Sequence, residues 1–219
     1  MNDTNATTNT RPNAWGRWGP DDEAGALNLI GPAQVKRAAG LVRTGEVLRL
    51  AQPLSHKTPV PRHRSGLQHF MGRDGGDYAA GAKRPGGFQF AEDTVVKPLH
   101  IGTHIDALCH AWCEEKMFNG YRETPMRSTS GATRLGVEKM PPAFTRGVPD
   151  NFAVEVLPFA AGTVFPVHQC VIRDFGIPLL EGLMLEPLAK TGRADFLFVA
   201  AALPIVGATG SPLTPLAIL

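Results

Sequence analysis

Residues 100–110 have the sequence HIGTHIDALCH, which contains three of the seven histidines of this 219-residue chain. Imidazole nitrogens and carboxylate oxygens are common ligands of divalent metal ions, and histidine also transfers protons near neutral pH. His100, His104 and Asp106 could supply three ligands and leave coordination positions open for water and substrate. The stretch therefore predicts a catalytic metal site.

The backbone expected around this stretch is a strand that leads into a turn. Residues 94–99 (TVVKPL) favour a strand that delivers His100, and Gly102 allows a tight turn after it. His104 and Asp106 are two residues apart, so they would share one face of an extended segment. A turn followed by an extended segment would bring these ligands together.

His110 is predicted to act as the general acid and base, because its ordinary pKa lies near the working pH. It could instead be a further metal ligand or a packed histidine. In another alternative, Cys109 and Cys113 join His104 and His110 in a closed structural zinc site. That spacing lacks the two separated ligand pairs typical of such sites and leaves Asp106 unused. We interpret the thiols as packing residues in the wall of the site.

The composition limits the class of protein. A hydrophobic content of 43% is enough for one sizeable domain with a core. The net charge of +2, from 22 basic and 20 acidic residues, gives no large field to attract nucleic acid or an anionic membrane. No apolar run reaches the ~20 residues of a membrane span, and residues 1–13 lack a secretory signal. We predict a cytoplasmic protein whose three cysteines are reduced.

Apolar periodicity and turn residues predict an α/β fold for the rest of the chain. Residues 1–13 are rich in Asn and Thr and predict a disordered tail, followed by a single domain over residues 14–219. Residues 60–90 predict a long surface loop, either close to the site or disordered. The other expected elements are strands at 47–50, 152–157 and 196–206, a helix from Pro32 to Gly40 or Gly45, and a helix over 168–176.

The pattern His-x-Gly-Thr-His-x-Asp, followed by His110, resembles the signature of the cyclase family of metal-dependent hydrolases. Bacterial kynurenine formamidase and isatin hydrolase belong to this family. The resemblance covers most of the chain, including WGRWGPDDEAGALNLI, MFNGY, GATRLGVEKMPPAFTRGV, PVHQCVIRDFGIPLLEGL and LFVAAALPIVGATGSP. It implies a cyclase-like swivelling β/β/α architecture with a mixed central sheet.

The resemblance also implies a fuller metal site. One or two divalent ions, zinc or manganese, are expected. His100, His104 and Asp106 match the ligands of the first ion, with Asp106 bridging to a second ion held by His168 and Glu181. Taken alone, a residue such as His168 could equally be a helix-start or packing residue, and one such as Glu181 would usually be a solvated carboxylate. A homo-oligomer, either dimer or tetramer, is implied as well.

The reaction implied by the resemblance is hydrolysis of an amide C–N bond in an N-formyl aryl amine or a cyclic amide. Metal-activated water would be the nucleophile, with His110 as acid and base. Four aromatic residues could stack against a small aromatic substrate or belong to the core. They are Trp15, Trp18, Phe70 and Trp112.

The chain departs from the family between Val148 and Asp150, where members usually carry a long additional stretch. This difference suggests an internally deleted member with a junction near 148–150. Without the stretch, apolar faces of the remaining strands would be exposed. The alternative function is therefore a non-catalytic, truncated paralogue that serves as a metal-binding or oligomerisation module.

Overall fold

The computed structural model describes residues 12–81, 84–148, 155 and 164–219. The tail predicted for residues 1–13 lies outside the described residues except for its last two positions. The strand predicted at 152–157 also lies outside them, apart from Glu155, and so does most of the junction at 148–150. These predictions stay predictions.

The larger sheet has four strands, and all of its pairs are antiparallel. In order across the sheet they are β1 (Val47–Arg49), β9 (Leu216–Ile218), β7 (Phe196–Ala200) and β5 (Ala143–Gly147). The strand predicted at 47–50 is confirmed to within one residue. The strand predicted at 196–206 ends at Ala200, before Pro204, which has no N–H to donate to a strand ladder.

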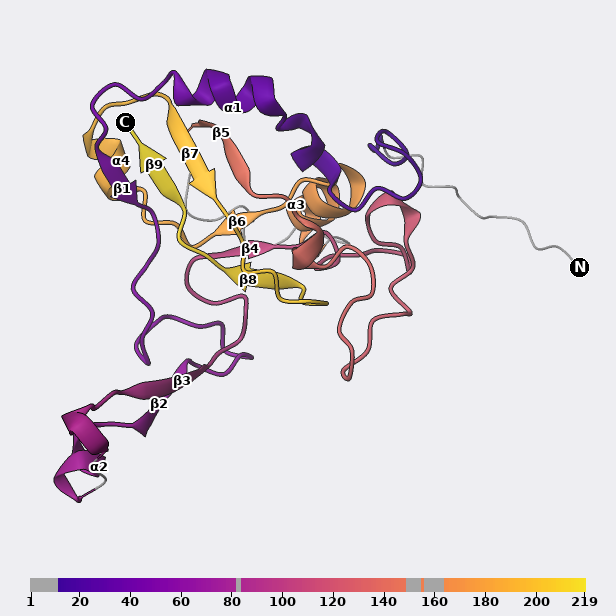
Figure 1. Ribbon diagram of the computed structural model, residues 1–219. Coiled ribbons are helices and arrows are strands. Elements are labelled where there is room, and N and C mark those ends of the chain that lie inside the picture. The colour runs from indigo at the N-terminus through magenta and orange to yellow at the C-terminus, as the bar shows by residue number, and fades with distance from the viewer. Residues whose placement is uncertain (1–11, 82–83, 149–154, 156–163) are drawn as a thin grey trace, which may run out of the picture.

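Helix α1 (Pro32–Ala39) covers part of this sheet. It begins with proline at its first turn and is followed by Gly40, as the sequence predicts. It packs against β5 and β7 (Figure 1). Val35 and the buried Ala38, which are three residues apart, lie on the more buried side of the helix.

A smaller sheet of three strands carries the centre of the HIGTHIDALCH stretch. Strand β4 (His104–Asp106) lies between β6 (Leu180–Glu181) and β8 (Gly210–Pro212), antiparallel to both. Every described strand pair is therefore antiparallel, and the prediction of a mixed central sheet is wrong for the described residues.

The prediction of a long surface loop over residues 60–90 is also wrong, because much of this segment belongs to a hairpin arm. Strands β2 (Gln68–Arg73) and β3 (Glu92–Val96) pair with each other and extend away from the body of the protein (Figure 1). Their tip carries α2 (Gly75–Ala79), capped by Asp74, and η2 (Pro85–Gly87). The strand predicted at 94–99 is β3, which ends four residues before His100.

The predicted helix over 168–176 is confirmed in position, but most of it is a π-helix. Its first turn is α3 (Pro166–His168), and it continues as η5 (Gln169–Asp174). The remaining helices are η1 (Gly25–Leu29), η3 (Phe118–Gly120), η4 (Val137–Lys139) and α4 (Glu186–Lys190).

Two apolar clusters hold these elements together. The larger one contains Leu108, Phe118, Leu135 and Ile172, which are all fully buried. It joins the segment after β4 to the π-helix, so it fixes the elements that carry His104, Asp106 and His168. None of the described helices combines the length and apolar character that a membrane span requires.

Candidate metal centre

Strand β4 presents two of the predicted ligands on one face. His104 is paired with Glu181 of β6, and Asp106 is paired with Gly210 of β8. Asp106 has no exposed surface and His104 is 5% exposed. The central position of a three-stranded sheet therefore holds an imidazole and a carboxylate together in a buried place.

His104 points one ring nitrogen at two carboxylates. Its Nδ1 lies 2.9 Å from the carbonyl oxygen of Gly102, which can only accept, so this nitrogen carries the proton. The Nε2 is then left with a lone pair. It lies 3.4 Å from Oε2 of Glu181 and 3.6 Å from Oδ1 of Asp106.

His168, from α3, approaches the same two carboxylates. Oε1 of Glu155 lies 2.8 Å from both the backbone nitrogen and Nδ1 of His168. A carboxylate only accepts, so Nδ1 is the donor and Nε2 keeps its lone pair. This Nε2 lies 3.7 Å from Oδ2 of Asp106 and 3.8 Å from Oε1 of Glu181.

These four side chains fit a metal cation. When the rings are neutral, lone pairs of His104 and His168 face two carboxylates, and a bound cation or a ring proton turns this repulsion into attraction. The buried Nε2 of His104 and Oδ2 of Asp106 have no hydrogen-bond partner among the described residues. Ligand atoms of His104, Asp106 and Glu181 lie within 4.8 Å of one another. Imidazole and carboxylate are suitable ligands for zinc or manganese.

His100 has a different set of contacts. Its Nδ1 lies 2.7 Å from Oδ1 of Asp106, and its Nε2 lies 2.9 Å from Oγ1 of Thr209. Both ring nitrogens therefore have protein partners. Together with His110, His100 and Asp106 form a second group whose ligand atoms also lie within 4.8 Å. The grouping differs from the predicted first set, which joined His100 with His104.

His110 stacks on His100, with ring centroids 4.0 Å apart. Burial lowers the pKa of His110 to about 4, and the nearby charge of Asp106 offsets only part of this effect. At neutral pH the ring is therefore uncharged and able to accept a proton. His110, the predicted proton carrier, is itself a member of the second ligand group, together with His100 and Asp106.

The two carboxylates are ionised near neutral pH. Burial acts to raise the pKa of Asp106, but the hydrogen bond from His100 and the charges of nearby histidines outweigh it and hold the pKa below its ordinary value. The contact with His104 lowers the pKa of Glu181. Burial acts to lower the pKa of His104, and its contacts with Glu181, Gly102 and Asp106 raise it overall.

The cysteines take no part in either group. Cys109 is fully buried, and desolvation raises the pKa of its thiol to about 12. Among the described residues, the groups able to hold an ion contain no cysteine. The alternative zinc site of Cys109 and Cys113 with two histidines is therefore not formed there. Packing of Cys109 in the core agrees with the sequence interpretation.

Three residues around the centre were not predicted from the sequence. Glu155 orients His168, Thr209 contacts His100, and Arg64 donates a hydrogen bond to the carbonyl oxygen of His100. Only Glu155 gave a signal, as a single charged residue within the apolar run FAVEVL. Thr209 and Arg64 come from loops whose position depends on tertiary structure.

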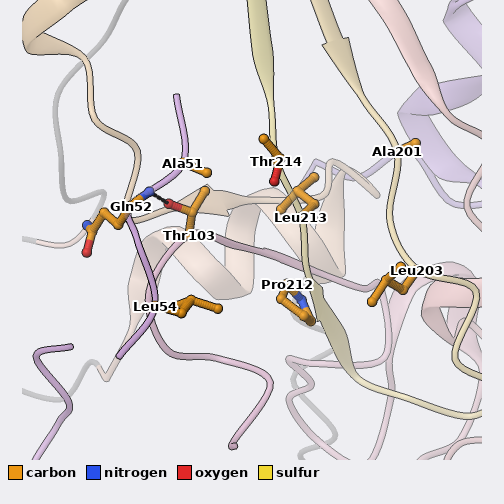
Figure 2. A pocket seen from close by; sticks show the side chains of 9 residues that line it. All are labelled: Ala51, Gln52, Leu54, Thr103, Ala201, Leu203, Pro212, Leu213 and Thr214. Carbon is orange, nitrogen blue, oxygen red and sulfur yellow. Dashed lines mark hydrogen bonds between the residues drawn. The ribbon is translucent and has the colours of Figure 1, made fainter. Parts of the chain in front are cut away.

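A separate pocket of about 280 Å³ lies near the start of β4. Its lining includes Leu54, Thr103, Leu203 and Pro212 and contains none of the predicted site residues (Figure 2). Thr103 accepts a hydrogen bond from the backbone nitrogen of Gln52 and donates one to the carbonyl oxygen of Gly182. Its hydroxyl therefore holds the backbone at Gly182, directly after Glu181.

The aromatic residues considered for substrate stacking are divided between core and surface. Trp15 and Trp18 pack against the larger apolar cluster, and the indole nitrogen of Trp15 donates to the carbonyl oxygen of Arg173. Phe70 lies on the exposed hairpin arm and is 55% exposed. Trp112 is 46% exposed and lies two residues after His110.

Comparisons with known proteins give matches only among solved structures. No family model matches the chain, and no curated protein matches it. A crystal structure described as a novel cyclase is 29% identical, with a TM-score of 0.85, and the match covers 95% of this chain and 100% of that one. An isatin hydrolase bound to the product analogue thioisatinate is 18% identical, with a TM-score of 0.50, over 89% of this chain and 98% of that one.

The isatin hydrolase match concerns the fold alone, whereas the cyclase match combines a similar fold with sequence identity over nearly the whole length. Both agree with the family resemblance predicted from His-x-Gly-Thr-His-x-Asp. The chain therefore has the fold of the cyclase family.

Proposed function

We propose that this chain is a metal-dependent hydrolase that cleaves an amide C–N bond in an N-formyl aryl amine or a cyclic amide. One observation carries the metal dependence. The buried Nε2 of His104 and Oδ2 of Asp106 lack hydrogen-bond partners among the described residues and face Glu181 and His168. The family fold and the isatin hydrolase match support the choice of reaction.

The ion would be held by His104, Asp106, His168 and Glu181, with His100 as the further predicted ligand. One or two ions of zinc or manganese are expected, with Asp106 common to both ligand groups. When bound, the ion supplies a Lewis acid that polarises the amide carbonyl and lowers the pKa of a water molecule.

His110 would move the proton. As an uncharged imidazole it accepts a proton from the attacking water and then donates it to the leaving nitrogen. Water and amide are thereby converted into a carboxylic acid and an amine. Stacking on His100 fixes the ring, because His100 is itself held between Asp106 and Thr209.

Hydrolysis of formanilide, with and without added zinc or manganese, tests this proposal. We expect hydrolysis only by the metal-loaded protein, and we expect His110→Gln to bind metal but turn over at least about a hundredfold more slowly. Full activity in the metal-free protein would refute the proposal. A stable, metal-loaded but inert protein would favour the alternative, a metal-binding or oligomerisation module.

Two further properties remain predictions. The homo-oligomer, dimer or tetramer, is expected from the family resemblance, and light scattering after gel filtration measures it directly. The cytoplasmic location is expected from the sequence, and fractionation of the producing cells would test it.

A further inference from the structure

Arg64 brings a positive charge to the edge of the candidate metal centre. It lies on the connection between β1 and β2, where its backbone nitrogen donates to the carbonyl oxygen of Pro61 at 2.9 Å. This turn directs the half-buried side chain to His100, and Nη1 donates to the His100 carbonyl oxygen. His100 in turn contacts Asp106 and stacks on His110.

The guanidinium group of Arg64 retains unused donors. It has several N–H groups in a planar fork, and only the contact to His100 uses one of them among the described residues. A planar fork of this kind matches the two oxygens of a carboxylate. No described carboxylate forms an ion pair with Arg64, so a carboxylate from outside the chain can use these donors.

The segments of sequence on either side of the contact between Arg64 and His100 carry further positive charge. The connection that carries Arg64 has no acidic residue between Glu46 and Asp74, whereas Lys57 and Arg62 add positive charge. In the segment that leads to His100, Nζ of Lys97 lies 3.4 Å from the carbonyl oxygen of Leu99. An anion approaching this edge meets an attractive field.

With a metal ion bound at the centre, the positive charge of Arg64 would have no negative charge there to balance it. A divalent ion cancels the two negative charges of Asp106 and Glu181, so the charge of Arg64 remains. The Arg64 guanidinium donates to the carbonyl oxygen of His100, whose ring stacks on His110, so this charge lies beside the second ligand group. The loaded centre therefore favours a negatively charged ligand beside His100.

We propose that Arg64 is a specificity-determining residue that binds a carboxylate beside the metal centre. This inference rests on the proposed amide hydrolysis. That reaction releases a carboxylic acid, and its substrate can also contain a carboxylate group. In both cases, the substrate and the released acid, the group that Arg64 would bind is a carboxylate. Arg64 would hold the anion by paired hydrogen bonds from the donors that His100 does not use.

Calorimetric titration of the metal-loaded protein with benzoate and with formate tests this inference without requiring turnover. Benzoate represents a carboxylate carried by an aryl substrate, and formate represents the acid released from a formamide. We expect Arg64→Gln to weaken benzoate binding roughly tenfold or more, because a hydrogen bond to a charged group is lost. Arg64→Lys should show a smaller loss, and Arg62→Gln, which removes an exposed charge of the same loop but no proposed hydrogen bond to the anion, should show a much smaller loss than Arg64→Gln.

The outcomes separate the sources and the possible roles. A loss limited to benzoate supports a carboxylate on the substrate, whereas a loss for both anions supports the released acid. Unchanged affinity for both anions in Arg64→Gln overturns the inference. It is also overturned if metal affinity and anion affinity fall together, since Arg64 would then only support the His100 backbone. Arg64-dependent anion binding without hydrolysis of either formanilide or 2-formamidobenzoate, an aryl formamide that carries a carboxylate, would refute the proposed function and leave this inference standing.

Discussion

His100 holds one carboxylate oxygen of Asp106 and leaves the other one free: Nδ1 of His100 lies 2.7 Å from Oδ1, and Oδ2 has no hydrogen-bond partner among the described residues. Oδ2 lies 3.7 Å from Nε2 of His168. The hydrogen bond therefore orients a buried anion so that its unused oxygen points to a ligand-type nitrogen. Asp106 therefore belongs to both ligand groups.

Asp106→Asn should lower the metal affinity at least about a hundredfold, because it removes a charge and a ligand oxygen while keeping the side-chain shape. Equilibrium dialysis against zinc, combined with circular dichroism to check the fold, measures the effect. Asp93→Asn is the matched control, since Asp93 lies exposed on the hairpin arm and its side chain pairs with His69. Equal metal affinity of Asp106→Asn and the parent protein would exclude the site.

Glu155 should set the metal affinity without contacting the ion. Glu155→Ala removes the acceptor for both the backbone nitrogen and Nδ1 of His168, so the ring loses its fixed orientation. We expect a loss of about 10–100-fold in zinc affinity. Glu155→Gln keeps an acceptor oxygen and should lose less. If the two variants bind zinc as the parent protein does, His168 is not oriented by Glu155.

Metal affinity should fall as the pH falls. The pKa of His104 is raised above 6.5, because the contacts with Glu181, Gly102 and Asp106 outweigh burial. Protons therefore compete with the ion for Nε2 already at a pH above 6.5, and the apparent affinity should fall roughly tenfold per unit below the raised pKa. Zinc titrations across this range measure the slope. An affinity independent of pH there would show that His104 is not a ligand.

The raised pKa of His104 predicts the opposite pH dependence for the stability of the metal-free protein. A raised pKa in the folded state means that the contribution of His104 to stability is fully present below pH 6.5 and is lost as the pH rises through the folded-state pKa. The metal-free protein should lose this contribution on alkaline titration, whereas bound metal should hide the loss. Thermal melts with and without zinc compare the two states.

The alignment of β6 with the HIGTHIDALCH stretch should depend on Gly182. This residue has a φ of +69°, and a Cβ there would lie 2.5 Å from the carbonyl oxygen of Gly102. Gly182→Ala should displace Glu181 from His104 and lower both stability and metal affinity. Gly192→Ala is the matched control, because Gly192 has a φ of +67° and a Cβ there would meet no described atom within 4 Å. Both variants carry similar backbone strain. The additional loss of stability and metal affinity in Gly182→Ala therefore measures the steric effect of the Cβ.

The sequence predicted those parts of the structure that depend on local chemistry. His104 and Asp106 are two residues apart, and strand geometry alone places them on one face. Pro32 marks the start of α1 because its restricted φ suits the first turn of a helix. Gly40 marks the end because its backbone is permissive. The pairing of His168 with Glu181 came from the family resemblance, and the structure brings both to Asp106 and His104.

Other parts depended on contacts between distant segments. The hairpin arm was missed because glycine, arginine and proline in residues 60–90 hide β2, which is stabilised by pairing with β3. The antiparallel order of β6, β4 and β8 could not be predicted, since it joins segments that are far apart in the sequence. Contacts of Thr209 and Arg64 with His100 arise in the same way.

The most direct test of the metal centre is the metal content of the purified protein, measured together with its activity. Metal-loaded protein should contain roughly one or two equivalents of zinc or manganese and hydrolyse formanilide. His104→Ala should lose both properties, because the buried Nε2 faces the two carboxylates. Full hydrolysis by metal-free protein, or unchanged metal content and activity in His104→Ala, would contradict the account.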